Sequence, residues 1–212
     1  MTLDEYISIH STPENAVLES LTRDTHVHVL NPHMLSGHVQ GRVLSMMSHM
    51  IRPKRILELG TFTGYSALCL AEGLAEGGRL VTIEHNDELE ETIRRNLSRS
   101  SLCDRIELRI GDCKEILSND ERALSWTNDQ YDLVFIDADK REYCEYLELV
   151  YPLVPVGGRM LSAITISNGM RLLFVTLTAL HLFRWSQQIT ARYIIMIRVI
   201  MIMIRLDIRS KR

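Results

Sequence analysis

The sequence predicts an α/β fold in which a doubly wound, mainly parallel sheet follows an N-terminal helical extension. Short apolar runs alternate with amphipathic helical segments, and this order implies parallel strands joined by right-handed crossovers. The runs at 81–84 (VTIE) and 133–136 (LVFI) are apolar on both alternating faces, as strands buried on two sides require. A length of 212 residues suits one domain with a full hydrophobic core.

Two helices are expected before the sheet begins. Thr12, Pro13 and Glu14 open an apolar-periodic stretch through Leu18 and Leu21, which predicts a helix with a threonine cap and a proline in its first turn. A second helix is expected over about 37–50, where apolar side chains recur on one face.

Strands and helices then alternate. The expected strands are 55–60 (RILELG), 79–84 (RLVTIE), 105–110 (RIELRI), 131–137 (YDLVFID) and 159–163 (RMLSA). Helices are expected over about 65–75, 88–99 and 141–151. Asn86 or Asp87 can cap the helix after the second strand, and acids follow in its first turns, where the helix dipole favours them.

Composition and charge limit the function. With 24% charged residues and a net charge of −3, the chain gives no electrostatic reason to expect a nucleic-acid partner. Its four cysteines lack metal or redox spacing, which suggests reduced thiols in a cytoplasmic protein. No secretion signal is visible, and the apolar run at 172–183 is too short to span a bilayer, so we expect no membrane anchor. Histidines 26, 28, 33 and 38 lack ligand spacing and are expected to be solvated or in the core.

The candidate site lies at the strand ends, because doubly wound sheets bind ligands outside the carboxyl ends of their strands. The residues that stand there share a pattern, since every strand end carries a glycine turn or a carboxylate. They are Glu58 to Gly64 after the first strand, Glu84-His85-Asn86 after the second, Gly111-Asp112-Cys113 after the third and Asp137-Ala138-Asp139-Lys140 after the fourth.

The residues at the strand ends indicate a nucleoside ligand without phosphates. The Gly60–Gly64 turn matches neither the dinucleotide nor the phosphate-loop pattern and contains no arginine or lysine. Glu84 can accept hydrogen bonds from both ribose hydroxyls, and Asp112 can meet an adenine amino group. S-adenosylmethionine is the common ligand of this kind. The alternative is that Glu84 and Asp112 only cap helices, and that the Asp-Ala-Asp-Lys run is a helix cap with a surface lysine.

At this point the sequence resembles a known family. The segments ELGTFTGYSALCLA, TIEHN, GDCKEIL and YDLVFIDADKREY resemble the cation-dependent O-methyltransferases, which include the caffeoyl-CoA and catechol O-methyltransferases. The segment 33–44 (HMLSGHVQGRVL) resembles the lid that the family places over its cofactor. The resemblance covers about residues 12–163 and implies a Rossmann-like sheet, methyl transfer to a small-molecule hydroxyl, a homodimer and a cytoplasmic location.

The resemblance also implies residue roles. The expected cofactor-binding residues are Met34, Ser36, Glu58, Gly60, Thr61, Phe62, Tyr65, Ser66, Glu84, His85, Asp112, Cys113 and Asp137. Asp137 matches the family's first metal-binding aspartate, and Lys140 matches its general-base lysine. A phenol titrates near about pH 10. A divalent cation lowers that value and orients the acceptor, and a lysine can take its proton.

The pattern breaks after the fifth strand. The family completes its cation site there with an Asp-Asn pair, where this chain continues from Ala163 with Ile164 and Thr165. One carboxylate binds a hard cation poorly, so we expect the activity of this chain to be impaired. From Ile164 onward there are eight basic residues, one acid, one glycine and no proline. We therefore divide the chain into an O-methyltransferase domain (1–163) and a divergent tail (164–212).

Two questions stay open from the sequence. A reading-frame shift is the simplest explanation of the tail, and a genuine divergent end that adds strands or a partner surface is the alternative. For function, the alternatives to an O-methyltransferase are a non-catalytic protein that keeps cofactor binding or only the fold, and an RNA or protein methyltransferase. The acidic balance and the D-x-x-K signature argue against the latter.

Overall fold

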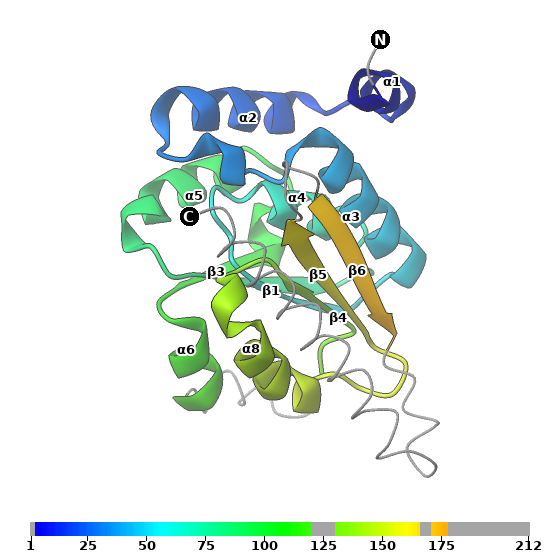
Figure 1. Ribbon diagram of the computed structural model, residues 1–212, viewed down its shortest axis with the longest axis vertical. Coiled ribbons are helices and arrows are strands. Elements are labelled where there is room, and N and C mark those ends of the chain that lie inside the picture. Colours follow the sequence, from blue (N-terminus) through cyan, green and yellow to red (C-terminus); the bar gives the residue numbers. More distant parts are fainter. Residues whose placement is uncertain (1–2, 120–129, 166–170, 178–212) are drawn as a thin grey trace, which may run out of the picture.

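The computed structural model describes residues 3–119, 130–165 and 171–177, and within them a six-stranded sheet forms the centre of the molecule (Figure 1). The strand order is β3-β2-β1-β4-β5-β6. The strands are β1 (Arg55–Leu59), β2 (Arg79–Glu84), β3 (Ile106–Ile110), β4 (Leu133–Ile136), β5 (Arg159–Thr165) and β6 (Arg171–Leu177). β1 to β5 are parallel, β6 is antiparallel to β5, and the strand order reverses between β1 and β4. The predicted doubly wound fold is confirmed.

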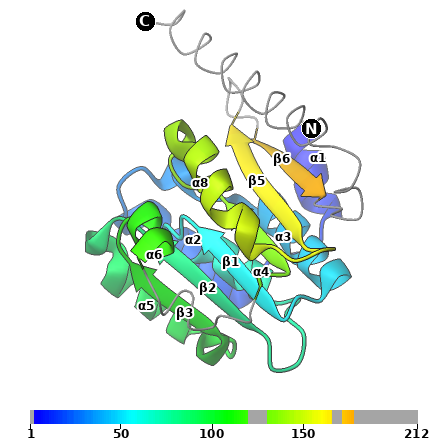
Figure 2. The same ribbon diagram turned by 90° about the horizontal axis from the view of Figure 1, so that it is seen from below.

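Helices cover both faces of this sheet (Figures 1 and 2). The helices are α1 (Leu3–His10), α2 (Ala16–His28), α3 (Gly37–Ile51), α4 (Tyr65–Ala71), α5 (Glu90–Ser98), α6 (Cys113–Asn119) and α8 (Tyr143–Val150). Short 3-10 turns are η1 (Pro32–Met34), η2 (Asp87–Leu89), η3 (Cys103–Arg105), η4 (Lys140–Glu142) and η5 (Tyr151–Leu153). Among the described residues, no helix is both long enough and apolar enough to span a membrane.

The core consists of two layers because strand side chains alternate between the faces. On one face, Ile56 and Phe135 pack with apolar residues of α2, α3, α4 and α5. On the other, Leu57 and Val134 pack with α8 residues such as Tyr143 and Val150. Burial on both faces explains why β1, β2 and β4 are almost continuously apolar.

Three details of the first helices differ from the sequence-based expectation. Thr12 is not a helix cap: the Asn15 side chain accepts hydrogen bonds from the amides of Val17 and Leu18, so α2 begins only at Ala16. α1 was not predicted at all. α4 ends at Ala71 and not near 75. Gly73, just beyond it, lies so close to α3 that a Cβ there would be 2.3 Å from the backbone nitrogen of His49.

Candidate active site

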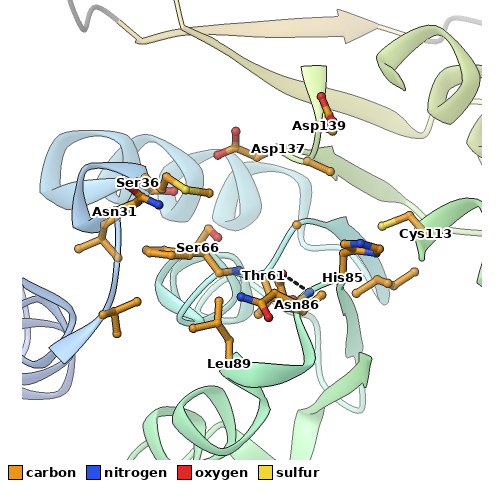
Figure 3. A pocket seen from close by; sticks show the side chains of 18 of the residues that line it. Asn31, Ser36, Thr61, Ser66, His85, Asn86, Leu89, Cys113, Asp137 and Asp139 are labelled. Atoms are coloured by element: carbon orange, nitrogen blue, oxygen red, sulfur yellow. Dashed lines mark hydrogen bonds between the residues drawn. The ribbon is translucent and has the colours of Figure 1, made fainter. Parts of the chain in front are cut away.

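A pocket of about 1170 Å³ opens at the carboxyl ends of the strands (Figure 3). Its walls come from the segments that follow β1, β2, β3 and β4, and residues 28–36 between α2 and α3 close one side. In Figure 3, Asn31 and Ser36 lie at one end of the pocket, and His85 and Cys113 lie at the other. A cavity of this size at a topological switch point is the usual place for a ligand in such a fold.

The turn after β1 forms the floor of the pocket. Gly60 (φ 94°), Phe62 (φ 52°) and Gly64 (φ 92°) all have left-handed backbone conformations, which fold the chain sharply into α4. The Gly60 amide donates to the Ile83 carbonyl at 2.9 Å. A Cβ on Gly60 would lie 2.6 Å from the Asp137 carbonyl oxygen, so the glycine lets this turn touch the end of β4.

Glu84 at the end of β2 is held by the backbone on both sides. Its Oε2 accepts a hydrogen bond from the Phe62 amide at 2.7 Å, and its Oε1 accepts one from the Asn86 amide at 2.9 Å. Asn86, and not Glu84, caps the following turn, η2. A carboxylate has about four acceptor positions, so these two bonds fix its direction and leave capacity for a ligand.

Asp112 is both a helix cap and a pocket residue. Its Oδ1 accepts from the amides of Lys114 (2.8 Å) and Glu115 (3.1 Å), while its Oδ2 lies 3.9 Å from His85 Nδ1. Asp112 therefore caps the helix through Oδ1 only. The two hydrogen bonds to Oδ1 also fix the direction in which Oδ2 points. The neighbouring Cys113 is buried, and burial raises the pKa of its thiol to about 12.

Glu58 does not line the pocket, although the sequence groups it with the cofactor-binding residues. It is fully buried on the strand face that it shares with Ile56, beneath the turn. Its Oε2 accepts from the Thr82 hydroxyl at 2.6 Å, and Thr82 in turn pairs with Thr61. Burial raises the pKa of Glu58 to about 8. The residue supports the floor of the pocket from below.

The residues after β4 divide into two groups. Asp137 and Lys140 line the pocket, and the Asp137 amide donates to the Leu59 carbonyl at 2.9 Å. Asp139 also borders the pocket, but it caps η4 by accepting from the Arg141 amide at 2.9 Å. The Arg141 guanidinium pairs with the same carboxylate, and these bonds lower the pKa of Asp139. The helix-cap alternative therefore fits Asp139.

The donor set does not fit a divalent cation. Among the described residues, no group of three histidine, cysteine, aspartate or glutamate side chains is placed to hold a metal ion. The sequence has Ile164 and Thr165, directly after Ala163, where an Asp-Asn pair would stand. The Ala163 carbonyl accepts a hydrogen bond from the Tyr143 hydroxyl at 2.8 Å. Asp139, the carboxylate two residues after Asp137, is already paired with Arg141.

The pocket brings together nearly all residues that the sequence singled out. Apart from Glu58, the twelve other expected cofactor-binding residues and Lys140 all line it, including Met34 and Ser36 from the N-terminal segment. The sequence reasoning missed further lining residues, among them His28, Asn31, Leu89, Glu142 and Tyr146. Asn31 did carry a signal, because an asparagine before a proline favours a turn, and it has a left-handed backbone here. Trp126, which we expect from the sequence to be a packing residue, lies outside the described residues.

Fold and pocket together define a Rossmann-like α/β domain with a ligand-sized crevice at its switch point. Residues 8–176 match the family model described as O-methyltransferase, and the chain belongs to this family. The resemblance inferred from the sequence motifs is thereby confirmed. The match also extends past Ala163, into β6.

Individual relatives agree with this assignment. The chain is 33% identical over 130 residues to the catechol O-methyltransferase of Niastella koreensis (61% of this chain, 58% of the relative). It is 33% identical over 132 residues to that of Mycobacterium tuberculosis (62% and 56%). The chain thus spans little more than half the length of these curated relatives.

Solved structures show the same fold. The O-methyltransferase from Bacillus cereus in complex with SAH superposes with a TM-score of 0.70 at 30% identity, covering 79% of this chain and 74% of that one. The O-methyltransferase TomG from Streptomyces achromogenes in complex with SAM gives 0.71 at 28% identity, covering 79% and 73%.

Proposed function

We propose that this protein binds S-adenosylmethionine and is by lineage an O-methyltransferase for a catechol-like or other small-molecule hydroxyl. The observation that carries the proposal is the Gly60 turn beside Glu84, whose carboxylate is fixed by two backbone amides at the pocket floor. The relatives named as catechol O-methyltransferases support the acceptor class.

The pocket fits the cofactor. A Cβ on Gly60 would collide with the end of β4, so only glycine leaves room at this point of the turn. The turn contains no lysine or arginine that could bind a phosphate. In this proposal Glu84 holds the ribose, Asp112 and Cys113 border the adenine, and Ser66 and Tyr65 border the methionine part. The remaining lining residues of the same set are Met34, Ser36, Gly60, Thr61, Phe62, His85 and Asp137.

Lys140 and Asp137 are the candidates for the chemistry. When bound, S-adenosylmethionine supplies a methyl group that leaves the sulfonium sulfur as the acceptor oxygen bonds to it. Lys140, in its neutral form, takes the proton from the acceptor hydroxyl. Asp137 and the walls of the pocket orient the acceptor in line with the methyl group, which lowers the entropic part of the barrier.

We expect the cofactor affinity to depend on Glu84. Glu84→Gln should weaken binding of S-adenosylhomocysteine by about tenfold or more, because each hydrogen bond to a charged group contributes about 1.5–3 kcal/mol. Isothermal titration calorimetry measures this. Glu91→Gln, which changes an exposed glutamate outside the pocket, is the matched control. Equal affinities for the Glu84 variant and the unmodified protein would disprove the ribose assignment.

Methyl transfer by this chain should be weak and independent of magnesium, because the cation site is incomplete. A methylation assay on a catechol panel, with magnesium and with EDTA, tests this expectation. Turnover that is strong and stimulated by magnesium would contradict it and would require metal ligands beyond Asp137.

A non-catalytic cofactor-binding protein is the second candidate. It is favoured by the pairing of Asp139 with Arg141 and by Ile164-Thr165 in place of the Asp-Asn pair. Binding of S-adenosylhomocysteine without any methyl transfer across the panel would select it. We also infer a cytoplasmic homodimer from the family resemblance, and light scattering after gel filtration measures the oligomeric state.

A further inference from the structure

A chain of charged and phenolic side chains links α6 to α8 beside the pocket. Lys114 Nζ lies 2.7 Å from Glu142 Oε1, and the Tyr146 hydroxyl donates to Glu142 Oε2 at 2.6 Å. Lys114 Nζ also lies 3.2 Å from Glu145 Oε2. Glu142 and Tyr146 line the pocket, and Lys114 directly follows Cys113, which lines it too. The two helices lie side by side on one face of the sheet (Figure 2).

Local helix energetics do not account for this arrangement. α6 has seven residues, which is too short for a helix to be stable by itself. Lys114 stands in its first turn, where the helix dipole disfavours a cation. The lysine is instead accommodated by the two carboxylates of α8 and its preceding turn. The start of α6 is therefore held in place by a contact outside the helix.

The residue just before this helix, Asp112, lines the pocket. Asp112 Oδ1 is bound to the Lys114 and Glu115 amides, so the direction of Oδ2 depends on where the first turn of α6 lies. The side chains of Lys114 and Glu142 are about one-third exposed (33% and 29%), so solvent screens the pair. We therefore expect loss of the Lys114–Glu142 pair to shift Asp112 locally and to change the stability of the fold only slightly.

We propose that Lys114, Glu142 and Tyr146 are positioning residues that hold Asp112 and Cys113 against the adenine and thereby set the preference of the pocket for that base. This inference rests on the proposed cofactor site. It predicts that breaking the chain reduces discrimination between bases, and not only affinity.

The test compares two ligands that differ at one group. S-adenosylhomocysteine carries an adenine amino group, which would donate a hydrogen bond to Asp112. S-inosylhomocysteine carries a carbonyl oxygen in its place. Calorimetry on the full chain gives the ratio of the two affinities for the unmodified protein, Lys114→Met, Lys114→Arg and Tyr146→Phe. Arg94→Met, which breaks the exposed Arg94–Glu90 pair on α5, is the control.

We expect the preference for the adenine ligand to fall about five- to tenfold in Lys114→Met and less in Tyr146→Phe. It should be largely restored in Lys114→Arg and unchanged in Arg94→Met. Tyr146→Phe loses one hydroxyl only, so it provides the test if Lys114→Met does not fold. An unchanged ratio in both variants, or no preference in the unmodified protein, would overturn the inference. Failure of the unmodified protein to bind either ligand would instead reject the proposed function.

Discussion

Glu58 is a carboxyl group that folding places entirely out of water. The Thr82 hydroxyl donates a hydrogen bond to Glu58 Oε2, and hydrogen bonding by Thr82 and Ser66 offsets only part of the effect of burial. Burial disfavours the charged form, which raises the pKa from the ordinary 4.5 to about 8. In neutral solution the folded protein therefore holds a proton that the unfolded chain has released.

This difference makes stability depend on pH. The unfolded chain loses the Glu58 proton above pH 4.5 and the folded protein keeps it until about pH 8, so the contribution of Glu58 to stability falls through this window as pH rises. The slope is at most about 1.4 kcal/mol per pH unit. We expect Glu58→Gln to remove this slope, as measured by urea unfolding across the window. Glu91→Gln should keep it, and parallel curves for Glu58→Gln and the unmodified protein would contradict the assignment.

At the scale of elements, the floor of the pocket depends on the contact between the turn after β1 and the end of β4. Gly60 and Gly77 both have left-handed backbones (φ 94° and 69°), but only Gly60 has a neighbour where a Cβ would stand. Left-handed conformations cost an L-residue about 1–2 kcal/mol. Substitution of Gly77 by alanine would therefore introduce backbone strain alone, whereas substitution of Gly60 would introduce both strain and a steric clash.

We expect Gly77→Ala to destabilise the protein by about that strain alone, and Gly60→Ala to cost clearly more and to abolish binding of S-adenosylhomocysteine. Urea unfolding and calorimetry measure the two effects. Equal losses of stability in both variants would mean that the Asp137 carbonyl moves away without penalty, and that the contact does not fix the floor.

The elements differ in how well the sequence predicts them. β1, β2 and β4 are clear because burial on both faces demands a continuous apolar run. The start of α2 is missed because Thr12-Pro13 has the composition of a helix start, whereas the side chain that reaches the free amides belongs to Asn15. Glu58 is not among the lining residues because its side chain lies on the same strand face as Ile56, and the motif alone does not reveal that face.

For the whole molecule, the sequence predicts most of the site because ligand-binding residues in this fold follow each strand in order. It predicts the N-terminal wall only in part: Met34 and Ser36 were expected, whereas His28 and Asn31 belong to the end of α2 and a connecting turn without periodicity. Glu142 and Tyr146 were missed because Glu142 is joined to Lys114, 28 residues away in the sequence, and Tyr146 is joined in turn to Glu142.

The origin of the tail (164–212) remains a prediction, since most of these residues lie outside the described part of the chain. The family match to residue 176 and the pairing of β6 with β5 favour a genuine end for that short stretch. The composition from Ile164 onward favours a reading-frame shift. We expect resequencing of the coding DNA to reveal a one-base insertion or deletion near codon 164 that restores an Asp-Asn pair. If neither alternative frame encodes one, the end is genuine.

The pairing of β1 with β4 has a consequence for how the molecule assembles. It joins distant segments, as where the Arg55 amide donates to Asp132, 77 residues away. β1, β2 and β3 can associate as consecutive units, whereas the crevice beside Gly60 closes only once the chain has returned. Closing so long a loop costs entropy before any contact compensates for it. We therefore expect a nascent chain to pair its first strands before it forms the pocket. A ligand that recognises the complete crevice should then stabilise only the final stage of folding.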